Sequence, residues 1–120
     1  MCFNAAVSNL DDHPRNHAVL AVGRNWRLSP AFDLTPAPVI SNDRRDLAMY
    51  CGDAGRFANR KNLLSQYGRF LLAEEEAAGI VDEIVSTVRK AWRPTMRQAG
   101  VSAADCDAIA GAFLYEGFFL

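Results

Sequence analysis

The sequence has few of the residues from which metal clusters, disulfide frameworks and membrane spans are built. It contains three cysteines, Cys2, Cys51 and Cys106, which are widely spaced and form no CxxC pair, so neither a zinc site nor a disulfide framework is expected. It has no apolar run of about 18 residues and no basic segment before an apolar core, so no transmembrane helix or signal peptide is predicted. Thirteen basic and fourteen acidic residues give a formal net charge of −1, which does not indicate direct nucleic-acid binding or an anionic membrane. We expect a soluble, cytoplasmic protein.

Apolar residues at steps of three and four predict helices at the start of the chain and in its second half. Residues 1–10 show this spacing without an N-cap, so we interpret them as the end of a longer helix. Asn59 is a suitable N-cap for a helix through about Tyr67, with Gly68 as its stop. A long helix is predicted over 73–98, because its apolar positions are periodic and its first turn is acidic.

The C-terminal end combines a capping signal with many aromatic residues. Ser102 and Asp105 resemble a capping box and predict a last helix that carries Ile109, Ala112 and Phe113, with an extension to Phe118 left open. The larger aromatic side chains are expected in the core, namely Trp26, Trp92, Phe113, Tyr115, Phe118 and Phe119. The arginines around the middle of the chain are expected on a solvated surface, namely Arg44, Arg45, Arg56 and Arg60.

A β-hairpin is predicted near the start of the chain. Residues 17–22 and 26–28 form its strands, and residues 23–25 supply the turn. Residues 40–56 are interpreted as an irregular connection with at most one strand. The fold class is therefore mainly α with one small β-hairpin, in a single domain, 1–120, that consists of a loop-rich part (1–58) and a helical bundle (59–120).

Two loops collect the carboxylate and amide side chains. The first loop, residues 9–17, contains Asp11 and Asn16 five positions apart; the second loop, residues 29–38, follows the hairpin and contains Asp33. Phosphoryl transfer requires a carboxylate that orients the attacking hydroxyl and oxygen ligands for magnesium. The Asp-to-Asn spacing is that of the protein-kinase catalytic loop. The ordered series of helix, first loop, hairpin and second loop indicates half of a phosphoryl-transfer site.

Two segments of the chain resemble the C-terminal catalytic region of HipA-type serine/threonine kinases. They are NLDDHPRNHAVL, residues 9–20, and WRLSPAFDLTP, residues 26–36. The first matches the family pattern D-x-H-x-x-N, and the second matches S-P-x-[FY]-D. HipA-type kinases are the toxin components of HipA–HipB toxin–antitoxin modules, and their fold is similar to that of protein kinases. The resemblance implies that this chain is the helical C-lobe of such a fold.

The resemblance also implies a role for each matched position. Asp11 would be the catalytic aspartate that faces the substrate hydroxyl, while Asn16 and Asp33 would bind the magnesium of MgATP. His13 would support the loop or approach a phosphate, and Phe32 would line the nucleotide pocket. Magnesium and ATP are thus the implied cofactors.

The nucleotide-gripping N-terminal lobe of the family has no counterpart in the sequence. There is no G-x-G-x-x-G stretch, and the only lysines, Lys61 and Lys90, fall in predicted helices. We therefore expect a piece of a kinase that is inactive without an N-terminal lobe. The surface that would meet that lobe is expected to be apolar and to drive self-association, as a homodimer.

Other interpretations remain open. The chain could be a remnant without activity, or a non-catalytic interaction module that binds a HipB-like antitoxin or a kinase partner. Asp11 and Asp12 could simply cap the first helix, and His13 could be structural. A metal-hydrolase site built from Asp11, Asp12, His13 and Asp33 is disfavoured, because His17 is the only further histidine.

Overall fold

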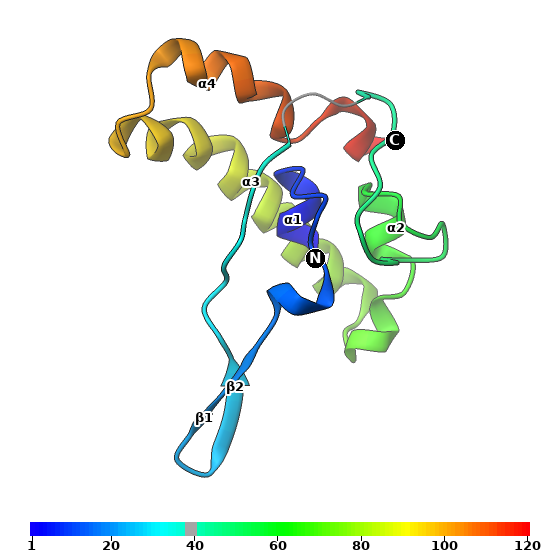
Figure 1. Ribbon diagram of the computed structural model, residues 1–120. Helices are drawn as coiled ribbons and strands as arrows, with labels where there is room; N and C mark the ends of the chain where they lie inside the picture. Colours follow the sequence, from blue (N-terminus) through cyan, green and yellow to red (C-terminus); the bar gives the residue numbers. More distant parts are fainter. Residues whose placement is uncertain (38–40) are drawn as a thin grey trace.

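The computed structural model describes residues 1–37 and 41–120 and shows a mainly α-helical chain with one antiparallel hairpin, as predicted (Figure 1). The elements are α1 (Cys2–Ala6), the 3-10 turn η1 (Pro14–Asn16), β1 (Val19–Val22), β2 (Asn25–Leu28), α2 (Arg60–Leu64), η2 (Tyr67–Phe70), α3 (Glu74–Gln98), α4 (Ala103–Ile109), η3 (Ala110–Ala112) and η4 (Glu116–Phe119). Within the described ranges, no helix combines the length and the hydropathy that a bilayer span requires.

The long helix α3 is the element on which the others pack. It contacts α1, α2 and α4, and Figure 1 shows α4 running beside its C-terminal half. Because Val81, Val85 and Val88 recur at helical spacing, α3 presents one buried apolar stripe to α1 and the C-terminal segment. The buried cluster around this stripe consists of Ala5, Ala6, Val7, Leu47, Cys51, Ala58, Leu63, Val81, Val85, Val88, Tyr115 and Phe118.

The predicted helix caps are present. The Asn59 side chain accepts a hydrogen bond from the Asn62 amide at 2.9 Å, and Ser102 Oγ accepts one from the Asp105 amide at 3.1 Å. The Glu76 carboxylate accepts from the Ala73 amide at 2.8 Å and so closes the first turn of α3. Beyond the end of α3, Gly100 has a φ of +88°, which a glycine adopts without strain.

The three helices predicted at the start of the chain, after Asn59 and after Ser102 are shorter than predicted, and the first of them is Cys2–Ala6 rather than residues 1–10. α2 ends at Leu64, because Ser65 Oγ donates to the Asn62 carbonyl and accepts from the Asp53 amide, which tightens the last turn; Gly68 lies inside η2. The described part of 40–56 contains only isolated bridges, such as Asp46 with Phe57. The last helix, α4, ends at Ile109 and is followed by 3-10 turns.

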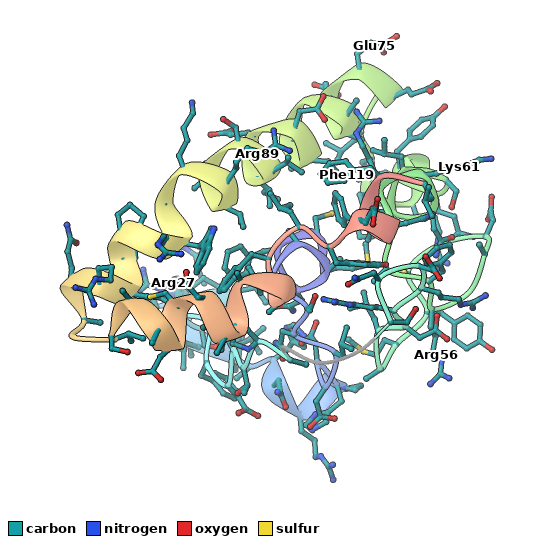
Figure 2. The ribbon with its side chains drawn as sticks, turned by 90° about the horizontal axis from the view of Figure 1, so that it is seen from above. Arg27, Arg56, Lys61, Glu75, Arg89 and Phe119 are labelled. Atoms are coloured by element: carbon teal, nitrogen blue, oxygen red, sulfur yellow. The ribbon has the colours of Figure 1, made fainter. Side chains whose placement is uncertain are left out.

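Three expectations about burial are wrong, those for Trp26, Arg45 and Phe119. Trp26 is 71% exposed rather than in the core, because the hairpin extends away from the helices and all eight of its strand residues are exposed (Figure 1). Arg45 is only 2% exposed rather than solvated, whereas Arg56 points away from the body as expected (Figure 2). In the aromatic tail Tyr115 and Phe118 are buried, but Phe119 is half-exposed and lies beside Arg89 of α3 (Figure 2).

A buried asparagine organises the loop before α2. Asn62 is 3% exposed; its Nδ2 donates to the Gly55 and Phe57 carbonyls at 3.1 and 2.9 Å, and its Oδ1 accepts from the Ala54 amide at 2.7 Å. Gly52 packs so closely on this turn that an added Cβ would lie 1.9 Å from the Asn62 carbonyl oxygen. The position therefore requires glycine for space.

Gly52→Ala should lower the free energy of unfolding by about 3 kcal/mol, because the new methyl group must displace a buried backbone carbonyl. Urea unfolding followed by circular dichroism measures this change. Gly79→Ala is the matched control: Gly79 lies within α3 with nothing within 4 Å of its added Cβ, so this variant should be more stable by roughly 1 kcal/mol. Equal effects of the two substitutions would contradict the packing at Gly52.

Candidate active site

The first loop begins where α1 ends and turns at Pro14. Pro14 occupies the first position of η1, where its missing N–H leaves no donor unsatisfied. The Asn16 amide donates to the His13 carbonyl at 2.9 Å, which closes the turn. As a result the Asn16 side chain points inward and is only 8% exposed, whereas Asp11 is exposed.

The hairpin returns the chain so that the two loops meet. Asn16 Nδ2 donates to Asp33 Oδ2 at 2.9 Å, a contact between residues 17 positions apart. The register of the hairpin pairs Val19 with Leu28, and a two-residue turn at Gly23-Arg24 connects the strands. The structure thus brings together the two residues for which the sequence predicted a shared metal site.

Asp33 has a left-handed backbone with a φ of +57°. This conformation is unfavourable for most residues, but aspartate and asparagine tolerate it better than others. Left-handed non-glycine residues are concentrated at functional sites, where the surrounding structure compensates for the strain. Here Asn9 contributes to that compensation, because its Nδ2 donates to the Asp33 carbonyl at 3.5 Å and to Asn4 Oδ1 at 3.3 Å.

Asp12, which has no assigned role in the sequence motif, is the buried acid of the first loop. Asp12 is 4% exposed, and its carboxylate Oδ1 lies 2.7 Å from His17 Nε2. The pair spans the turn at Pro14 and links its two ends. Sequence reasoning missed this pair; the available signal was an Asp and a His on either side of a proline turn, which is too common to be specific.

A cavity of about 290 Å³ opens between the first loop, the second loop and α1. Its polar wall contains Asn4, Asp12, Asn16 and His17, and its apolar wall contains Leu28, Pro30, Phe32 and Leu34. The predicted residues Phe32 and Asn16 therefore face one space. Asp11, His13 and Asp33 are not among its lining residues.

His13 is half-buried, and its Nδ1 atom is buried without a hydrogen-bond partner among the described residues. The structure therefore shows no backbone hydrogen bond to this nitrogen from those residues. An unsatisfied buried nitrogen is unfavourable by about 1–3 kcal/mol and calls for an explanation. A phosphate role for His13 stays a prediction.

Asp12→Ala should lower the free energy of unfolding by about 1 kcal/mol, because it removes the buried partner of His17. Asp11→Ala is the adjacent control and should change stability by less than about 0.5 kcal/mol, since Asp11 is exposed. Thermal unfolding measures both. A larger loss of stability in the Asp11 variant than in the Asp12 variant would contradict the assignment of Asp12 as the buried structural acid.

Comparison with known proteins agrees with this geometry. The family model described as the HipA-like C-terminal domain matches residues 1–92, a range that includes both loops, the hairpin and most of α3. Neither the curated proteins nor the solved structures gave a significant match. The chain belongs to the family of HipA-like C-terminal domains.

Proposed function

We propose that this chain supplies the catalytic aspartate and the magnesium-binding residues of a HipA-like serine/threonine protein kinase. The observation that carries the proposal is the 2.9 Å contact between Asn16 and Asp33, which places the amide and the carboxylate of two separate loops side by side. The order of these residues along the chain is that expected for a kinase catalytic loop followed by its metal-binding aspartate.

The Asn16–Asp33 pair fits a magnesium ion. Because Asn16 uses its Nδ2 to bind Asp33 Oδ2, its amide oxygen and the second carboxylate oxygen remain as acceptors. Magnesium takes oxygen ligands, keeps several waters and is commonly held by one or two protein side chains together with substrate phosphates. When bound, the ion would neutralise charge on the phosphates.

Asp11 is the residue we propose to accept the proton of the substrate hydroxyl. Its exposed position lets a serine or threonine side chain of another protein approach it directly. The turn at Pro14 and the buried Asn16 fix the loop on which it stands. Positioning of this kind is the main contribution that a protein makes to phosphoryl transfer.

The cavity beside Asn16 is the proposed nucleotide side of the site. Its apolar wall, with Phe32, suits a planar ring, and its polar wall suits hydroxyl groups. The volume of this cavity is near the lower end for small-molecule sites. We therefore propose that a second lobe supplies the remaining contacts to ATP. Tight binding of MgATP by this chain alone is not expected.

The exposed hairpin favours a role in binding another protein. That protein would be an N-terminal kinase lobe or an antitoxin. Cross-strand pairing puts Val19, Leu28, Ala21 and Trp26 on one face, which is entirely apolar. Val19, Trp26 and Leu28 are 57%, 71% and 73% exposed. Two-stranded hairpins are marginally stable in isolation, and an apolar face of this kind is typical of an interaction site.

Phosphate transfer should appear when the chain is mixed with a HipA-type N-terminal lobe and MgATP, and Asp11→Asn or Asp33→Asn should reduce it by at least about 100-fold. Incorporation of labelled phosphate into protein serine or threonine measures the reaction. Asp43→Asn is the control, since Asp43 is an exposed aspartate outside both loops, and it should retain activity. Full activity of the Asp11 variant would exclude the proposed role.

The chain should self-associate through the apolar face of the hairpin when no partner lobe is present. Light scattering across a concentration series should show a dimer, and Trp26→Glu should weaken it by roughly tenfold or more. Tyr50→Glu is the control, because Tyr50 is 82% exposed but lies outside the hairpin. A monodisperse monomer at high concentration would contradict the prediction.

A further inference from the structure

The C-terminal segment, residues 112–115, is hydrogen-bonded to the end of α1, where the first loop begins. The Leu114 amide donates to the Ala6 carbonyl at 2.7 Å, and Ser8 Oγ donates to the Ala112 carbonyl at 2.7 Å. Residues 112–115 lie outside the range that the family model matches. The start of the first loop is thus held by a part of the chain beyond the matched domain.

Ser8 occupies a position where helices usually have glycine. The Asn9 amide donates to the Asn4 carbonyl and the Ser8 amide to the Ala5 carbonyl, which is the pattern of a Schellman motif with Ser8 at its left-handed position. Ser8 has a φ of +53° and is fully buried. A serine here is strained by about 1 kcal/mol or more relative to glycine, so its hydroxyl must contribute something that glycine cannot.

Arg45 is the second partner of that hydroxyl. Its guanidinium donates to Ser8 Oγ and, at 3.0 Å, to the Ser41 carbonyl, and it lies 4.4 Å from the centre of the Tyr115 ring. Tyr115 is itself held, because its hydroxyl donates to the Ala58 carbonyl at 2.8 Å. Burial lowers the pKa of Arg45 from its ordinary value. A buried cation with these few partners fixes the geometry of each of them.

Ser8 and Asn9 are also bonded to the second loop. The Ser8 carbonyl accepts from the Ala37 amide at 3.0 Å, and Asn9 Nδ2 donates to the Asp33 carbonyl at 3.5 Å. These two bonds hold the second loop near its end and at its aspartate. A displacement of Ser8 would therefore move Asp33 relative to Asn16.

We propose that the C-terminal segment 112–115, acting through Arg45 and Ser8, is a positioning element that aligns Asp33 with Asn16. This inference rests on the proposed function only in so far as the aligned pair binds a metal ion. Arg45 and Ser8 are positioning residues, because they touch the start of the first loop and not the proposed ion.

Two variants of the full chain test the proposal, each read by hydrogen exchange and by Mn²⁺ titration. Ser8→Gly removes the hydroxyl but relieves the backbone strain, and Arg45→Met removes the cation but keeps an unbranched buried side chain. In both, the Ala37 amide should exchange at least about tenfold faster, and Mn²⁺ should bind about 10- to 100-fold more weakly, as for other supports of metal ligands. Arg44→Met is the matched control and should leave both readouts unchanged, since Arg44 is exposed.

The outcomes separate this inference from the proposed function. A wild-type chain that does not bind Mn²⁺ would count against the metal site, while Ala37 exchange would still decide the positioning role. Unchanged Ala37 exchange in both variants would overturn the inference, as would unchanged Mn²⁺ affinity in variants of a chain that binds the ion. Equally accelerated exchange at Val81 and Val85 would indicate general unfolding and would also overturn it.

Discussion

The left-handed turn at Ser8 is the constraint that connects the helical core to both loops of the site. On its N-terminal side, Ala5, Ala6 and Val7 are buried in the cluster formed with α3. On its C-terminal side, the first loop leaves the core and the second loop is bonded back to it through Ala37. Because a helix of only five residues has little stability of its own, the position of the site depends on tertiary packing around this turn.

The hairpin satisfies a geometric requirement and creates an exposed surface as a consequence. Asp33 must return to Asn16, and a short antiparallel hairpin is the most economical way to reverse the chain between them. Because the hairpin projects from the helical body, neither face of its two strands is buried, and all eight strand residues are exposed. The apolar face with Trp26 is therefore exposed to solvent, and this exposure is the observation behind the proposed partner surface.

Local signals in the sequence predicted the elements of the fold, and the family resemblance predicted the contact between the loops. The caps at Asn59 and Ser102 and the turn of the hairpin are encoded within a few residues, and the structure confirms them. The burial of Arg45 and the exposure of Trp26 could not be predicted from local sequence, because burial depends on partners far away in the sequence. The bond from Arg45 to Ser8 spans 37 residues, and no spacing rule identifies it.

The candidate site therefore depends on residues from two parts of the chain, one inside the matched family domain and one after it. The motif residues Asn16 and Asp33 lie inside the matched family domain, whereas Ala112 and Tyr115, which hold Ser8 and Arg45, follow it. A hydrogen bond to a buried charged group contributes about 1.5–3 kcal/mol, a large fraction of the stability of a small domain. Loss of the hydrogen bonds that hold Ser8 would not change the motif residues Asn16 and Asp33. It would, however, free the left-handed turn at Ser8, on which the positions of both loops depend.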